Sequence, residues 1–426
     1  MCDCLVAVGS ETADGVALFA KNSDRHAHEC QPFVQAPGAF HAPGSTVRCT
    51  HIEIPQVAET YAVMGHSPWW CWGFEHGVNE HAVAIGNETI FSREELEGRP
   101  GLIGMELVRL GLERGRTARE ALEVMATLIE THGQGGSAFG PGEAGYHNGF
   151  LIADPSEAWI LQTSNRRWAA RRVRRDAISN HMSLGADWEI GSRDLESFAR
   201  AAGWWSQPRR IDVAAAYRNP HVPGRISEGR LRRARELLGA HAGRIDVAAM
   251  QSFLRDHGAG GPVRLPGGTP EDEHYYTLCM HSEPIGTTTA SLVAPLPAQR
   301  RDPWPVWISF ATPCTSVFLP VYLDAPLPAE LSRGGPEPDV ESAWWAFKVL
   351  QDAAATDFPL HTPALREAWK GLEARVAEER PRVEAAAARA RRAGDEAEAS
   401  RLLGEFTSRI WRAAMAQARE LASRLA

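Results

Sequence analysis

The chain has 426 residues, of which 44% are hydrophobic and 23% are charged, and its formal net charge is −8. These proportions are ordinary for a globular protein with room for two or three domains. The acidic balance argues against a nucleic-acid-binding protein, and no apolar stretch approaches the about 20 residues of a membrane helix. Because no signal peptide is recognisable either, we expect a cytoplasmic protein with neither nucleic-acid nor membrane partners.

The first residues, Met1-Cys2-Asp3-Cys4, carry two cysteines directly before an apolar run. Removal of Met1 would leave Cys2 with a thiol and a free α-amino group on one residue. An α-amino group has a pKa of about 7.7–8.0, so it can act as the general base for the thiol near neutral pH. On position alone, Cys2 could equally be an ordinary chain end or the first residue of a strand.

The next segment is predicted to be a β-hairpin. Residues 4–9 form an apolar strand, residues 12–15 end in an Asp-Gly turn, and residues 16–20 form a second strand. The second strand runs directly into the polar sequence Lys21-Asn22-Ser23-Asp24-Arg25. The hairpin is therefore expected to return Asp24 and its neighbours to the side of Cys2.

The remaining elements come in blocks. Residues 103–131 are helical by period, with Thr117 as an N-cap and the glycines of 133–136 as a stop. The other expected strands are 60–64, 81–87, 150–154, 158–163, 168–173, 177–180, 287–294 and 305–311, and the other expected helices are 192–202, 226–239 and 246–256. This order lacks regular βαβ alternation and predicts an α+β fold with antiparallel sheets covered by helices.

The composition changes near residue 326. We expect residues 1–325 to form the main domain, 326–340 a Pro/Gly-rich linker, and 341–426 a helical C-terminal extension. Helical composition covers 364–389 and 394–425, with breaks expected at Pro381 and near Gly394. The extension is expected to pack on the main domain or on a partner subunit, which would give a homo-oligomer through these helices.

No metal or cofactor is predicted. The seven cysteines and sixteen histidines are dispersed, and Cys2-x-Cys4 is not zinc-type spacing. The chain contains no phosphate-binding glycine loop, dinucleotide fingerprint or metalloprotease motif. The odd number of scattered cysteines indicates reduced thiols.

Several stretches match a known family in order. They include Cys2-Asp3-Cys4-Leu5-Val6-Ala7, the hairpin return 19–25, the segment 72–81, Ile85-Gly86-Asn87-Glu88 and the glycine-closed helix pair. Over about the first 320 residues the chain resembles the secernins and related cysteine dipeptidases of the N-terminal nucleophile (Ntn) hydrolase superfamily. The resemblance implies a four-layer αββα sandwich and a cysteine nucleophile exposed by removal of the leader, which here is Cys2. Cys4 is the rival, since alternation along a strand points it to the same face.

The resemblance also implies supporting residues. Asp24 matches an aspartate beside the nucleophile's amine, and Lys21 stands where the superfamily often has arginine. Asn87 matches an oxyanion-hole asparagine, and Asn180 a second asparagine. An active-site arginine is matched by Arg225, with Arg230 as its rival.

The implied activity is cleavage of a small peptide, of dipeptide type, at its amide bond by a thiol peptidase without a cofactor. Two alternatives stay open. The chain could be an amidase for a non-peptide acyl amide, or a non-catalytic secernin-like adaptor that keeps the fold.

Overall fold

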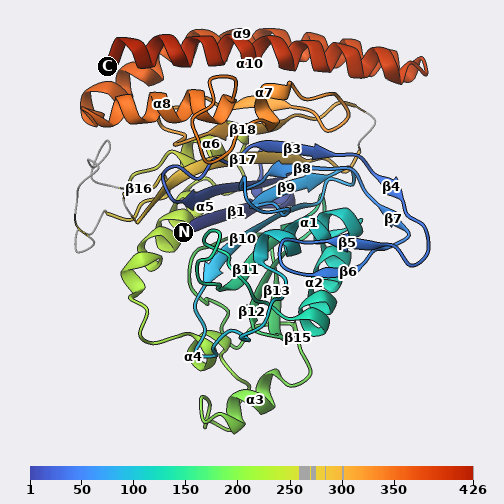
Figure 1. Ribbon diagram of the computed structural model, residues 1–426, viewed down its shortest axis with the longest axis vertical. Coiled ribbons are helices and arrows are strands. Elements are labelled where there is room, and N and C mark those ends of the chain that lie inside the picture. Colours follow the sequence, from blue (N-terminus) through green and yellow to red (C-terminus); the bar gives the residue numbers. More distant parts are fainter. Residues whose placement is uncertain (259–268, 270–274, 284, 300–301, 426) are drawn as a thin grey trace.

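The computed structural model describes the chain except for residues 259–268, 270–274, 284, 300–301 and 426. Two antiparallel sheets dominate it (Figure 1). Sheet A runs β14 (Arg175–Ile178), β1 (Cys2–Ala7), β2 (Ala17–Arg25), β17 (Gly286–Leu296), β18 (Val306–Phe310) and β19 (Leu319–Val321), with β16 (His281–Ser282) also paired to β17. Sheet B runs β15 (Ile190–Gly191), β13 (Arg167–Val173), β12 (Ala158–Ser164), β11 (His147–Ala153), β10 (Ala84–Ile90), β9 (His76–Asn79), β8 (Val63–His66) and β3 (Phe33–Ala36). Two short ribbons pair β4 (Ala39–Phe40) with β7 (Glu59–Thr60), and β5 (Thr46–Arg48) with β6 (Glu53–Pro55).

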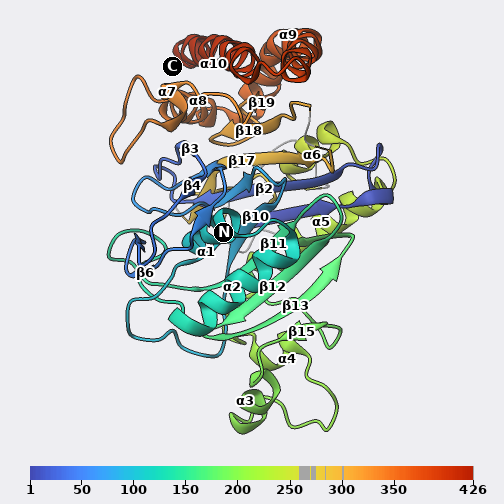
Figure 2. The ribbon, with the colours of Figure 1, turned by 90° about the vertical axis from the view of Figure 1, so that its right-hand side faces the viewer.

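Helices cover the outer face of each sheet (Figure 2). Helices α1 (Gly104–Arg114) and α2 (Ala118–His132) bury an apolar face against sheet B, and α5 (Glu228–Ala240) and α6 (Val247–Leu254) do so against sheet A. The smaller helices are α3 (Leu195–Ala201) and α4 (Val213–Tyr217), with 3-10 turns at Gly9–Glu11 and Gly224–Ile226. The predicted α+β, αββα sandwich is therefore the observed architecture. Among the residues described, no helix combines the length and apolarity needed to cross a membrane.

The N-terminal hairpin forms as predicted. In the pairing of β1 with β2, Cys2 lies opposite Ser23 and Cys4 opposite Lys21. Strand β2 extends to Arg25, beyond the predicted end at residue 20, because β17 pairs with it along its whole length. Alternation puts Cys4 in the core between the sheets and Leu5 in the core under α5 and α6.

The predicted start and end of helix α2 are also confirmed. The Thr117 hydroxyl accepts a hydrogen bond from the Glu120 backbone N–H at 3.1 Å and caps α2. Gly133, which follows the last residue of α2, has a φ of +73°, where a side chain would be strained. Cap and stop residues act locally, which is why the sequence located these ends well.

The C-terminal segment differs from its prediction in three places. It contains α7 (Ala329–Ser332), α8 (Ala343–Ala355), α9 (Phe358–Arg392) and α10 (Glu396–Leu425), of which α8 lies in the expected helical extension but outside its two stretches of helical composition. The expected linker 326–340 includes α7, whose Leu331 is fully buried. The expected break at Pro381 is wrong: α9 continues through it, since Val376 and Ala387 on either side are buried in the contact with neighbouring helices. The expected break near Gly394 is confirmed by its φ of +81°.

These helices pack on the sheets, along the edge formed by β18 and β19 (Figure 1). Trp344, Trp369 and Trp411 are completely buried and belong to the same apolar core as the space between the sheets. Their indole N–H groups connect the layers: Trp344 donates to Thr289 O and Trp369 to Thr315 O, both at 2.9 Å. The helical extension thus shares a core with the sandwich.

Gly86 on β10 sets the closest approach of the two sheets. A Cβ there would lie 2.7 Å from Cys4 Sγ and 2.7 Å from Lys21 Cδ, which is closer than such atoms approach. The glycine is therefore needed for sheet B to lie against the Cys4 and Lys21 side chains.

We predict that Gly86→Ala lowers the free energy of unfolding by about 1–3 kcal/mol, because it overpacks this contact. Urea unfolding would measure the change. Gly98→Ala is the matched control, since its Cβ meets nothing within 4 Å, and it should leave stability within about 0.5 kcal/mol. Equal effects of the two substitutions would contradict the assignment.

Candidate active site

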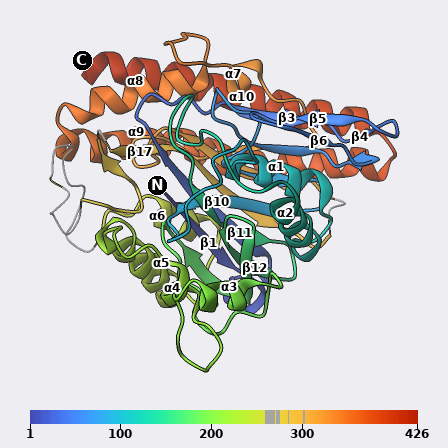
Figure 3. The ribbon, with the colours of Figure 1, turned by 60° about the horizontal axis from the view of Figure 1, so that its bottom comes forward.

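The N-terminus lies at the start of β1 in sheet A, the strand that packs on β10 of sheet B (Figure 3). Cys2 begins β1 and is only 4% exposed. The Met1 ammonium donates to Asp24 O at 2.6 Å, and the Asp24 N–H donates to Met1 O at 2.7 Å. The Cys2 N–H donates to Asn180 Oδ1 at 2.8 Å, and the Asn180 amide in turn donates to Thr89 O at 2.9 Å. The nitrogen that would become an α-amine therefore already has a fixed partner.

A buried arginine holds this arrangement from the helix side. Arg230 on α5 donates to Asn180 Oδ1 at 2.6 Å and to Cys2 O at 3.1 Å. It also pairs with the Asp3 carboxylate and lies 3.7 Å from that of Asp24. Arg225 is exposed on the 3-10 turn before α5, so Arg230 is the arginine that contacts Cys2.

Asp24 lies beside the amine position. Its carboxylate accepts a hydrogen bond from the Thr288 hydroxyl of β17 at 2.7 Å. Burial raises the pKa of the Asp24 carboxyl to about 7, although the terminal ammonium and Arg230 both favour its charged form. A carboxyl with a pKa near neutrality can take part in proton exchange at physiological pH.

The thiol of Cys2 faces a second group of charges. Its Sγ lies 3.9 Å from Glu75 Oε2, and Lys21 Nζ donates to the same oxygen at 3.0 Å and to Glu75 O at 2.8 Å. Arg25 lies 3.5 Å from the other Glu75 oxygen and bonds to Glu29 at 2.7 Å. This gives a buried row of alternating charges, Lys21, Glu75, Arg25 and Glu29.

This row controls the electrostatics of the thiol. Burial raises the pKa of Cys2 to about 11, although Lys21 and the terminal ammonium favour the thiolate. Burial also disfavours the charged form of Glu75. The positive charges of Lys21 and Arg25 outweigh this effect and hold the pKa of the Glu75 carboxyl below its ordinary value. Burial opposes the charge of Lys21, yet the negative charges of Cys2 as a thiolate and of Glu75 raise the pKa of its ammonium. With Met1 in place, Cys2 is accordingly a neutral thiol at neutral pH.

Asn87 on β10 is connected to the thiol through Glu75. It is 1% exposed, and with its amide nitrogen facing oxygen atoms it donates to Glu75 O at 3.0 Å and to the Glu75 carboxylate at 3.3 Å. The start of α1 lies against it, since a Cβ on Gly104 would come within 2.6 Å of the Asn87 side-chain amide. Asn87 therefore belongs to the same cluster.

Cys4, the rival nucleophile, lies in a different environment. It is completely buried in the core between the sheets. Burial and the neighbouring Glu88 raise the pKa of its thiol well above the ordinary value. Glu88 itself has a pKa raised by burial to about 8, although Lys21 favours its charged form. A carboxyl with a pKa near 8 is mostly protonated at neutral pH, and Glu88 lies beside the Cys4 thiol.

The structure thus gathers Cys2, Lys21, Asp24, Asn87 and Asn180 at one place and puts Arg225 outside it. Sequence analysis missed Glu75 and Thr288, both of which contact this group. The segment around Glu75 was quoted for its resemblance, but neither residue carries a local signal, because each meets the site only through long-range pairing of strands.

The chain belongs to peptidase family C69, whose profile matches residues 2–218. This is the family of the secernins and their dipeptidase relatives, to which the sequence resemblance pointed. Membership makes the chain an amide-bond hydrolase by class.

Comparison with solved structures finds distant Ntn-hydrolase neighbours. A C2A mutant of conjugated bile acid hydrolase from Clostridium perfringens is 12% identical, with 76% of this chain and 93% of that chain covered and a TM-score of 0.42. Penicillin V acylase from Agrobacterium tumefaciens is 13% identical, with coverages of 75% and 86% and a TM-score of 0.44. A Caenorhabditis elegans N-acylethanolamine-hydrolyzing acid amidase ortholog is 12% identical, with coverages of 70% and 94% and a TM-score of 0.34.

We predict that Glu75→Gln strongly destabilises the protein. The substitution leaves Lys21 buried without its ion-pair partner, while Arg25 keeps Glu29, and breaking a buried pair in this way costs about 3–5 kcal/mol. Chemical denaturation would measure it. Glu378→Gln, which removes an exposed pair with Arg382, should change the free energy of unfolding by less than about 0.5 kcal/mol. A loss below 1 kcal/mol for Glu75→Gln would contradict the buried charge row.

Glu88 gives a prediction for the pH dependence of stability. Its folded pKa of about 8 exceeds the ordinary 4.5, so between these values the folded chain binds a proton that the unfolded chain has lost. The stabilising contribution is complete below pH 4.5 and is lost as pH rises to about 8, at up to about 1.4 kcal/mol per pH unit.

The substitution Glu88→Gln keeps the shape of the side chain and cannot ionise. We expect it to make the decline in stability between pH 5 and pH 8 shallower and to stabilise the protein at pH 8, as measured by urea unfolding across pH. Asp24, Asp3 and Glu106, whose pKa values burial also raises, contribute to the decline that remains. An unchanged slope would show that Glu88 is ionised in the folded protein.

Proposed function

We propose that this protein is a cytoplasmic thiol peptidase that cleaves dipeptide-type substrates, with Cys2 as its nucleophile after removal of Met1. The observation that carries the proposal is the hydrogen bond from the Cys2 nitrogen to Asn180 Oδ1 at 2.8 Å, which Arg230 reinforces from α5. The amide oxygen that accepts from the Cys2 N–H is itself fixed by a buried guanidinium. In the same position it would accept from an α-amino group on Cys2 and orient that group beside the thiol.

Removal of Met1 changes both the charge beside Asp24 and the chemical nature of the Cys2 nitrogen. Hydrolysis of the Met1–Cys2 bond takes away the terminal ammonium that now donates to Asp24 O and leaves a new amine at Cys2. Asp24 and Asn180 then flank that amine. Because the new amine is attached to the same residue as the thiol, it can accept the thiol proton near neutral pH.

The reaction follows from these positions. The Cys2 amine takes the thiol proton, and the sulfur attacks the substrate carbonyl carbon. In the tetrahedral intermediate the negative oxygen would be stabilised by Asn87 and a backbone N–H, an effect of about 2.7–4 kcal/mol for one such donor in other enzymes. The amine then gives its proton to the departing amino group, which leaves a thioester on Cys2. Water, deprotonated by the same amine, hydrolyses the thioester and restores the thiol.

Family membership supports a peptide substrate over a non-peptide acyl amide. A panel of dipeptides and N-acyl amides assayed with the same preparation would decide between them. Preferred turnover of N-acyl amides would assign the second activity, and no turnover of either class would favour the adaptor alternative.

We expect intact-mass analysis of the purified protein to show loss of Met1, and a thiol-directed electrophile to label Cys2 ahead of the other six cysteines. Cys2→Ala should abolish turnover and leave the melting temperature within a few degrees of that of the wild type. Cys49→Ala, at another buried cysteine, is the control and should keep activity. Retained Met1 in an active preparation, or full activity in Cys2→Ala, would refute the mechanism.

The two candidate arginines give a matched pair of variants. Arg230→Lys keeps the charge beside Asp3 and Asp24 but loses the planar fork that reaches Asn180 and Cys2 together. We expect a fall of about ten- to a hundredfold in kcat/KM, which corresponds to the about 1.5–3 kcal/mol of a charged hydrogen bond. Arg225→Lys, on the exposed turn, should change kcat/KM less than twofold. A larger loss of kcat/KM in Arg225→Lys than in Arg230→Lys would show that Arg225 is the arginine of the active site.

A further inference from the structure

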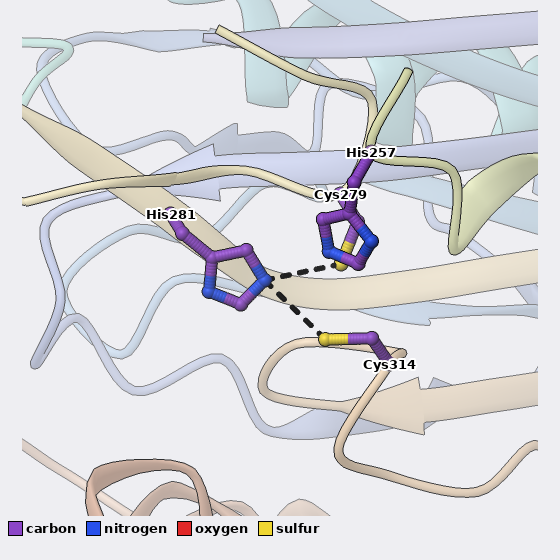
Figure 4. Close-up of side chains that lie close together, drawn as sticks. All are labelled: His257, Cys279, His281 and Cys314. Carbon is purple, nitrogen blue, oxygen red and sulfur yellow. Dashed lines mark hydrogen bonds between the residues drawn. The ribbon is translucent and has the colours of Figure 1, made fainter. Parts of the chain in front are cut away.

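Four potential metal ligands meet outside the candidate active site. They are His257, just after α6, Cys279, just before β16, His281 at the start of β16, and Cys314, in the turn between β18 and β19. One ligand atom from each lies within 4.8 Å of all the others. Figure 4 shows the two sulfur atoms and two imidazole rings facing a common point.

The distances match a tetrahedral site. His281 Nε2 lies 3.5 Å from Cys279 Sγ and 3.3 Å from Cys314 Sγ. Ligands at about 2.3 Å for sulfur and about 2.0–2.1 Å for nitrogen would be separated by about 3.3–3.8 Å along the edges of a tetrahedron. An inward movement of the most distant ligand by about 1 Å would complete this geometry.

The donors are available for a metal. His257 Nε2 is buried and has no hydrogen-bond partner among the described residues. Cys279 and Cys314 are free thiols that are 0% and 3% exposed. Phe358, at the start of α9, packs on both sulfur-bearing residues and edge-on to the His281 ring, so water has little access to the sulfur side.

We propose that these four side chains bind one Zn²⁺ ion in a structural Cys2His2 site. The set of two thiolates and two imidazoles is one that zinc selects, and four protein ligands leave no open position for a substrate. On binding, each thiol releases one proton to solvent and each neutral imidazole donates a lone pair. The centre, with one divalent cation and two thiolates, is electrically neutral and suits a buried place.

The site would tie together three segments, two of which bond to β2 and β17 close to Asp24. The carbonyls of Leu254 and Leu278, adjacent to the ligand segments, accept hydrogen bonds from the Asn22 amide at 2.9 and 2.7 Å. The Met280 N–H, between the two ligands Cys279 and His281, donates to Thr288 Oγ1 at 2.9 Å, and that hydroxyl donates to Asp24. Zinc would therefore stabilise the strand next to the amine position, whether or not the protein is a peptidase.

The test is the metal content of the full-length protein, prepared without a polyhistidine tag and under reducing conditions. We expect about one zinc per chain by plasma mass spectrometry, and X-ray absorption with sulfur at about 2.3 Å and nitrogen at about 2.0–2.1 Å. Cys314→Ser and His281→Ala should each lose most of the zinc. Cys71→Ser, at a cysteine outside the cluster, and Cys2→Ala should both keep it, which separates this site from the active-site thiol.

If a variant fails to fold, measurements on the wild-type protein still test the proposal. Chelation of the wild type should lower its melting temperature by several degrees, and added Zn²⁺ should restore it. Wild-type protein without stoichiometric zinc that also gains none on addition of ZnCl₂ would overturn the proposal. So would a mass lower by two hydrogens that maps to a Cys279–Cys314 disulfide, or equal zinc contents in Cys314→Ser and Cys71→Ser.

Discussion

Burial of charge beside the first strand is the constraint on which the rest of the molecule depends. Strand β1 lies between β14 and β2, and every one of its residues is buried. Asp3 is part of it, and a carboxylate in such a place requires a counter-charge. Arg230 supplies it from α5, which fixes that helix over sheet A and directs the same guanidinium to Asn180 and the Cys2 carbonyl. One structural ion pair thereby also aligns the start of the chain.

Alternation along β2 divides the site into two electrostatic halves. Lys21 and Arg25 point towards sheet B and enclose Glu75, so the thiol of Cys2 faces a row of paired charges. Asp24 points the other way, towards Thr288 and Arg230 of α5, and that arginine also holds Asn180, which accepts from the Cys2 nitrogen. The strand between the two halves keeps them apart. In the proposed mechanism the thiolate and its base are therefore tuned separately.

The proposed zinc site extends this support outwards. Two of its ligand segments have backbone groups that bond to Asn22, two residues before Asp24 on β2, and to Thr288, which pairs with Asp24 from β17. The C-terminal helices contribute as well, since Phe358 of α9 closes the cluster and the buried tryptophans join the helices to sheet A and its β18–β19 turn. The extension is thus part of the support of the sandwich core.

The sequence by itself determined what depends on neighbouring residues. The hairpin of β1 and β2, the Thr117 cap, the glycine stops at 133 and 394 and the blocks of helices and strands all follow from local turn chemistry and periodicity. Resemblance added Cys2, Asp24 and Asn180, which the structure brings together. Only the tertiary structure decided the partners: Arg230 instead of Arg225, the contact of Lys21 with Glu75 across 54 residues, and the meeting of His281 with Cys314 across 33. The physical reason is that charge pairing and metal ligation depend on distance in space, which strand pairing and helix packing set without leaving a local pattern in the chain.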